Sequence, residues 1–189
     1  MNIIKSGVNT PLKLLILSSF MAALTAVGAQ IRIPMFPVPF TLQTLFVLLS
    51  GNLLGAIWGG YSMLLYLALG LIGFPVFAGT SGLGVVFTPT FGYLLSFPIC
   101  AYWVGKRIAR EKENKKSLRR IFIINVIGQL WIFALGVPYL WLISKLYMGN
   151  HLPLKKALMV GFVMFIPGAL IKAMVAAWIT NHMKKGNLI

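Results

Sequence analysis

Long runs of apolar residues recur along this chain, and they limit its possible folds more than any other feature. One of them, FIPGALIKAMVAAWIT at 165–180, carries a single charged side chain, that of Lys172. A helix needs about 20 mostly apolar residues to cross a bilayer, and several runs approach that length. Only 10% of the 189 residues are charged, whereas soluble domains carry roughly 25%. The chain is therefore expected to be an all-α integral membrane protein that crosses the bilayer several times.

Six spans are predicted within a single domain, 1–189. They lie at about 12–29, 40–57, 60–73, 93–105, 121–143 and 157–180. A long segment rich in Gly, Thr and Pro, FPVFAGTSGLGVVFTPTFG at 74–92, follows the third span. Non-helical backbone at membrane depth is tolerated only when it is buried in protein or lines a cavity. We expect this segment to be a lid over a binding site rather than a loose surface loop.

The basic residues predict the orientation in the membrane. Eight of the 17 Lys and Arg residues lie in one loop, KRIAREKENKKSLRR at 106–120. With both chain ends in the cytoplasm, the inner segments carry twelve basic residues and the outer segments carry four. Cytoplasmic loops carry such an excess, so we predict an N-in, C-in topology. The net charge of +15 is then typical of contact with anionic lipid and does not indicate nucleic-acid binding.

Several classes of function lack the residues that they need. The only acids, Glu111 and Glu113, lie in the basic loop, so no carboxylate is available within a span to couple transport to an ion. Cys100 is the single cysteine, and His151 and His182 lie far apart in the sequence, so neither a metal site nor a catalytic triad is expected. No Walker motif for ATP binding is present. We expect a protein that is not an enzyme and has no cofactor.

Small residues recur every four positions in the first span, at Ser18, Ala22 and Ala26. Such a stripe lets two helices approach closely in lipid. It is either a contact surface for a partner protein or ordinary packing within the chain.

Three polar residues at or within predicted spans are candidates for ligand contacts. Lys172 either faces the interior of the bundle, available to a ligand carboxylate, or extends to the outer interface. Gln43 lies in an apolar helix start, where its amide contacts either a ligand or another protein group. Tyr93 begins a span and is either an interfacial anchor or a ligand contact.

A set of segments running in order along nearly the whole chain resembles the BioY family, the biotin-binding S components of energy-coupling factor transporters. The segments are ALTAVGAQIRIP, PVPFTLQTLFVLLSG, YLALGLIGFPVFAG, TPTFGYLLSF and FIPGALIKA. The resemblance implies a bundle of six helices in a prokaryotic cell membrane that captures the vitamin at its outer face. It also implies a transmembrane coupling subunit and two cytosolic ATPases as partners. A stand-alone facilitator, or an S component for a related acid such as lipoate, stays open.

The resemblance also points to ligand-binding residues, with one departure. The family usually has an aspartate where this chain has Ala169, followed three residues later by the lysine that matches Lys172. Loss of the aspartate removes an acceptor for the ureido N–H groups of biotin. It also leaves Lys172 without a local counter-ion, so an anionic ligand becomes a better match than a neutral one. The remaining candidates are the hydroxyl groups of Thr80, Ser81 and Tyr93, the amide of Gln43 and the ring of Phe77 in the lid.

Overall fold

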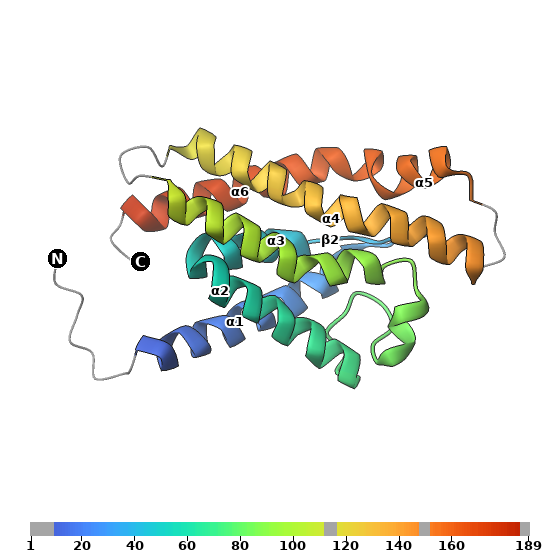
Figure 1. Ribbon diagram of the computed structural model, residues 1–189, viewed down its shortest axis with the longest axis horizontal. Helices are drawn as coiled ribbons and strands as arrows, with labels where there is room; N and C mark the ends of the chain where they lie inside the picture. The colour runs from blue at the N-terminus through green and yellow to red at the C-terminus, as the bar shows by residue number, and fades with distance from the viewer. Residues whose placement is uncertain (1–9, 112–116, 148–151, 186–189) are drawn as a thin grey trace.

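The computed structural model describes residues 10–111, 117–147 and 152–185, and it is almost entirely helical (Figure 1). Lys5, His151 and the centre of the basic loop, including Glu113, lie outside these ranges. The elements in chain order are α1 (Thr10–Gln30), β1 (Arg32–Ile33), β2 (Phe40–Thr41), α2 (Gln43–Ile72), η1 (Leu83–Phe87), α3 (Phe91–Arg110), α4 (Leu118–Leu146), α5 (Leu154–Gly161), η3 (Val163–Phe165) and α6 (Ile166–Lys185). The two short strands pair antiparallel as a hairpin between α1 and α2.

The helices form a bundle with α3 at its centre (Figure 1). Helix α3 packs against α2 on one side and against α4 on the other. Helix α1 lies against α2, and α6 lies against both α4 and α2. The β1–β2 hairpin lies against the end of α1, with both residues of β1 exposed and Thr41 of β2 buried. This arrangement brings the start of α2 close to the start of α6.

Helix α2 is interrupted at Gly55, where the backbone has φ 79° and ψ −172°. Glycine adopts a positive φ without a steric cost because it has no Cβ. The two parts of α2 then pack against each other: a Cβ on Gly59 would lie 2.8 Å from the carbonyl oxygen of Ser50. This element covers the predicted spans 40–57 and 60–73. Its break falls near their predicted boundary, and its helical start is delayed to Gln43 by strand β2.

Glycines also let α2 and α3 approach almost to backbone contact. A Cβ on Gly51 would lie 2.5 Å from the carbonyl oxygen of Ala101, and a Cβ on Gly105 would lie 2.3 Å from the carbonyl carbon of Gly55. Such close approach through small residues is how helices associate in lipid, where no hydrophobic force drives them together.

The last predicted span, 157–180, is divided in the structure. Helix α5 ends at Gly161, the backbone of Phe162 is non-helical, and α6 begins at Ile166 after the short turn η3. Pro167 is the second residue of α6, where its missing N–H costs no helical hydrogen bond. The chain therefore re-enters a helix just before Ala169 and Lys172.

Within the residues that the structure describes, four helical stretches are long and apolar enough to cross a membrane. They are Pro11–Gln30, Gln43–Ile72, Leu118–Leu146 and Leu154–Met183. Large apolar side chains cover much of the outside of these helices, as at Leu15, Phe20, Ile171 and Trp178. Helices with apolar residues on their outer as well as their inner faces are typical of membrane proteins. The structure thus supports a helical protein that crosses the membrane several times.

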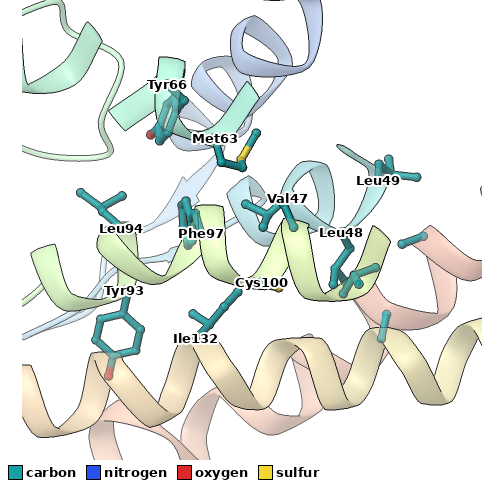
Figure 2. Packing of buried hydrophobic residues seen from close by; sticks show 14 of the residues in the cluster. Val47, Leu48, Leu49, Met63, Tyr66, Tyr93, Leu94, Phe97, Cys100 and Ile132 are labelled. Carbon is teal, nitrogen blue, oxygen red and sulfur yellow. The ribbon is translucent and has the colours of Figure 1, made fainter. Parts of the chain in front are cut away.

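The interior of the bundle is filled by side chains from α2, α3 and α4 (Figure 2). Val47, Leu48 and Met63 of α2 face Phe97 and Cys100 of α3, and all five are buried. Cys100 is fully buried and unpaired, as expected for a small packing residue. Phe97 also lines the cavity described next, so the core and the cavity wall are continuous.

Candidate ligand-binding site

A cavity of about 260 Å³ lies at the end of the bundle that holds the β1–β2 hairpin. This is close to the lower end of the range for small-molecule sites, roughly 300–1,000 Å³. Its lining comes from the hairpin, the starts of α2 and α3, the segment 77–90, α4 and the start of α6. All of the predicted ligand-contacting residues except Ser81 line it: Gln43, Phe77, Thr80, Tyr93, Ala169 and Lys172.

Lys172 points into the protein and not toward the outer interface. Its side chain is only 7% exposed, and Nζ donates a hydrogen bond to the carbonyl oxygen of Thr41 at 3.1 Å. The same ammonium group lies 4.4 Å from the centre of the Phe40 ring, a cation–π contact. The structure therefore places this cation at the cavity wall, within reach of a bound molecule.

Phe40 can take this position because residue 168 has no side chain. A Cβ on Gly168 would lie 2.1 Å from the Phe40 ring. The ring also stacks on Phe165, with 6.0 Å between the ring centres. The sequence FIPG at the start of α6 thus fixes the aromatic surface beside Lys172.

Gln43 is both a lining residue and a structural link. Its Nε2 donates to the hydroxyl group of Tyr66 at 2.6 Å, and that hydroxyl donates to the carbonyl oxygen of Val76 at 2.9 Å. The hydroxyl group of Thr41 donates to Oε1 of Gln43 at 2.7 Å. This chain of bonds holds the hairpin, both parts of α2 and the start of the segment 74–92 in one arrangement.

The segment 74–92 is anchored at the cavity by Phe77. The Phe77 side chain is 3% exposed, and its ring lies where a Cβ on Gly70 would be, 2.0 Å away. Its edge meets the Tyr66 ring with 5.4 Å between ring centres. Thr80 lines the cavity, whereas Ser81 does not; its hydroxyl oxygen is buried without a hydrogen-bond partner among the described residues.

Tyr93 and Ala169 both line the cavity, but the Tyr93 hydroxyl group, which was expected to contact the ligand, is bonded within the protein. The Tyr93 hydroxyl group donates to the carbonyl oxygen of Gly161 at 2.9 Å, so the ring lines the cavity while its polar end joins α3 to α5. Ala169 lines the cavity with a methyl group. Its carbonyl oxygen accepts a hydrogen bond from Nε2 of Gln129 at 2.8 Å.

Sequence reasoning missed several polar lining residues, above all Gln129 of α4. This side chain is 3% exposed and lies directly beside position 169. The available signal was a pair of amides one helical turn apart, Asn125 and Gln129, inside the apolar run 121–143, because a buried amide requires partners. Thr41, Thr44, Thr88 and Thr90 also line the cavity and were not singled out.

The polar groups around the cavity are neutral apart from Lys172. No acid is present among the described residues that line it. Glu111 lies in the basic loop region and pairs with Arg120 at 2.8 Å. A cation in a mostly apolar, acid-free cavity favours a ligand that combines apolar surface with a negative charge.

Comparison with known proteins agrees with this arrangement. A family model described as the BioY family matches residues 4–187. The chain belongs to the BioY family. It is 39% identical over 171 residues to a probable biotin transporter BioY of Lysinibacillus sphaericus, covering 90% of this chain and 86% of that one. It is 40% identical over 172 residues to the biotin transporter BioY of Thermotoga maritima, covering 90% and 95%.

The fold of this BioY-family chain also matches a solved structure. The crystal structure of the S-component for biotin from an ECF-type ABC transporter superposes with a TM-score of 0.79 at 27% identity. The match covers 97% of this chain and 95% of that chain. The similarity in fold therefore extends over nearly the whole chain.

The small-residue stripe of α1 lies at a packed interface within the chain. Ser18 and Ala22 are buried, and the Ser18 hydroxyl group donates to the carbonyl oxygen of Trp58 in α2 at 3.2 Å. Ala26 is partly buried against the core. Contact of this stripe with a partner stays a prediction. The outer face of α1 instead presents larger side chains, including Ile16, Phe20 and Val27.

Proposed function

We propose that this chain is the substrate-binding S component of an energy-coupling factor transporter and that its ligand is biotin. The proposal rests chiefly on one observation: a buried lysine, Lys172, stands in an acid-free, largely apolar cavity of a BioY-family chain. Biotin carries a carboxylate on an apolar tail and a ureido ring at its other end. The carboxylate would accept a hydrogen bond from Lys172, and the tail would contact aromatic lining residues such as Phe77 and Phe165.

The ureido ring requires both acceptors and donors. Gln129, Gln43 and the threonine hydroxyl groups around the cavity offer both kinds of group. We propose that Gln129 stands in for the acid that Ala169 lacks, because its amide already lies against the backbone of that residue. The neutral amide leaves the charge of Lys172 free for the ligand.

We propose further that the protein has six membrane-spanning helices with both ends in the cytoplasm. The two parts of α2 on either side of Gly55 would be separate spans, and α5 with α6 would form the last one. In that orientation the basic end of α3 faces the cytoplasm and the cavity faces outward. The segment 74–92 would act as a lid that admits ligand from outside.

Energy for uptake would come from partner proteins. The chain has only two acids, in the basic loop, and has no Walker motif. We propose a transmembrane coupling subunit and two cytosolic ATPases as those partners. Uptake by vesicles containing this chain alone would instead support a stand-alone facilitator.

Equilibrium binding to the purified, detergent-solubilised protein tests the ligand assignment. Labelled biotin should bind and be displaced by unlabelled biotin at much lower concentration than by lipoate. Tighter binding of lipoate, or of another acid with an apolar tail, would assign the cavity to that acid. Absence of binding by any such acid would overturn the proposal.

A further inference from the structure

A second hollow lies on the outer surface of the bundle, between the second part of α2 and α3. Its volume is about 380 Å³, and its walls include Ile57, Tyr61 and Leu64 of α2 and Tyr102 of α3. The walls are apolar apart from the tyrosine hydroxyl groups, and Ile57 and Tyr61 are 60% and 56% exposed. It is separate from the ligand cavity and shares no lining residue with it.

The floor of this groove is formed by Gly60 of α2, which has no side chain, and Pro98 of α3. A Cβ on Gly60 would lie 3.6 Å from Cβ of Tyr102 and 3.8 Å from the carbonyl oxygen of Pro98, so the two helices nearly touch there. No side chain fills the space above that contact. The lining comes from about one to two turns of each helix, residues 57–64 of α2 and 98–102 of α3. A hydrocarbon chain can lie along such an apolar groove.

A cation stands at one end of the groove. Nζ of Lys106 lies 5.5 Å from the centre of the Tyr102 ring, which forms a groove wall. Gly105 packs against Gly55, so this end of α3 lies beside the Ile57 end of the groove. Arg107 and Arg110 follow in the last turn of α3. The only acid among the described residues, Glu111, is bonded to Arg120.

We propose that this groove binds one anionic phospholipid, with an acyl chain between α2 and α3 and the phosphate group beside Lys106. An apolar groove ending at basic side chains is complementary to a molecule with a hydrocarbon chain and an anionic head. Basic residues near a membrane surface attract anionic lipid, and basic pockets between helices bind such headgroups. The site is independent of the ligand in the central cavity.

Native mass spectrometry of the detergent-solubilised full chain tests the proposal. The protein is incubated with dioleoyl phosphatidylglycerol or with dioleoyl phosphatidylcholine, which share their acyl chains and differ in head charge. The unmodified protein should retain one phosphatidylglycerol molecule in preference to phosphatidylcholine. Lys106→Gln should lower that preference about five-fold. Gly60→Leu, which fills the floor of the groove, should strongly reduce retention of both lipids.

Two matched variants serve as controls. Lys145 has the same contact with an aromatic ring, that of Trp141 at 5.5 Å, but does not border the groove. Lys145→Gln should leave the lipid preference unchanged. Ala23 is exposed on α1, so Ala23→Leu enlarges an outward-facing residue elsewhere and should leave retention unchanged. If Gly60→Leu does not fold, Tyr61→Ala removes a wall of the groove and should also reduce retention.

Several results would overturn the proposal. Unchanged retention in both groove variants would mean that the lipid binds elsewhere. Normal preference for phosphatidylglycerol in Lys106→Gln would mean that no anionic head is recognised at this end. Absence of any retained lipid, with the groove protected from labelling only when a membrane partner protein is added, would assign the groove to that protein.

Discussion

The ammonium group of Lys172 donates a hydrogen bond to the backbone carbonyl of Thr41, 3.1 Å away, and so joins α6 to the hairpin that precedes α2. The acceptor is neutral, and the other close group is the uncharged ring of Phe40. Burying a charge without a counter-ion is costly. A ligand carboxylate in the cavity would supply that counter-ion, which is why binding is expected to depend on the charge of the ligand.

Lys172→Met should weaken biotin binding about ten- to a hundred-fold. The variant keeps the apolar stem and removes the charge, and a charge-assisted hydrogen bond contributes about 1.5–3 kcal/mol. Isothermal titration calorimetry on the purified protein measures the change. Biotin with its carboxylate converted to an amide is the control ligand, because it should bind the variant and the unmodified protein almost equally. An equal loss for both ligands would place Lys172 at the ureido end.

Ala169→Asp introduces the acid that the resemblance to the family leads us to expect at this position. The new carboxylate would lie one helical turn before Lys172, on the same face of α6, and at the cavity wall. We expect biotin to bind more tightly, because the carboxylate accepts from the ureido N–H groups. Competition binding of biotin against lipoate measures the result. A lower affinity for biotin would mean that this cavity is adapted to a different acid.

Ligand binding should order the segment 74–92 more than the loop that follows α3. Phe77 and Thr80 line the cavity from this segment, so a bound molecule would favour its closed arrangement. Hydrogen exchange with and without biotin should show slower exchange at 74–92 and little change at 106–120. Equal effects in the two segments would argue against a lid.

Two substitutions on α1 should separate internal packing from contact with a partner. Ala22 is 2% exposed, so Ala22→Trp should disturb the packing of α1 on α2 and lower both stability and ligand binding. Ala23 is exposed, so Ala23→Trp should leave ligand binding intact. If the exposed face docks a coupling subunit, Ala23→Trp should still abolish vitamin uptake in cells that contain the complete transporter. Normal uptake by that variant would place the docking surface elsewhere.

Gly55→Ala should destabilise the protein by about 1–2 kcal/mol, because any other residue is strained at a positive φ. Nothing lies within 4 Å of the added Cβ, so the cost comes from the backbone alone. Gly60→Ala is the matched control: its Cβ would make ordinary contacts in a regular helix. It should stabilise the protein by roughly 0.5–1 kcal/mol. Thermal unfolding of both variants in detergent measures the difference, and equal melting temperatures would contradict the prediction.

Features that depend on neighbouring residues were predictable from the sequence. The apolar runs indicated a helical membrane protein, and the Gly-, Thr- and Pro-rich composition of 74–92 indicated a non-helical segment there. The break within α2 lies at Gly55, inside the predicted span 40–57. The length of an apolar run and the backbone preference of each residue depend only on residues close in the sequence. Both can therefore be inferred from the sequence alone. The division of the last span was missed, because Phe162 and η3 lie within a run that is apolar throughout.

The candidate site depends on contacts between residues far apart in the sequence. Lys172 was identifiable as a charge in an apolar helix, but its orientation depends on Thr41 and Phe40, which another element supplies. The same holds for Gln129, whose partner is Ala169, and for Ser18 and Ala22, whose spacing suited a partner protein and α2 equally well. Sequence spacing determines which residues share a helix face. Only the packing of the helices decides what that face meets.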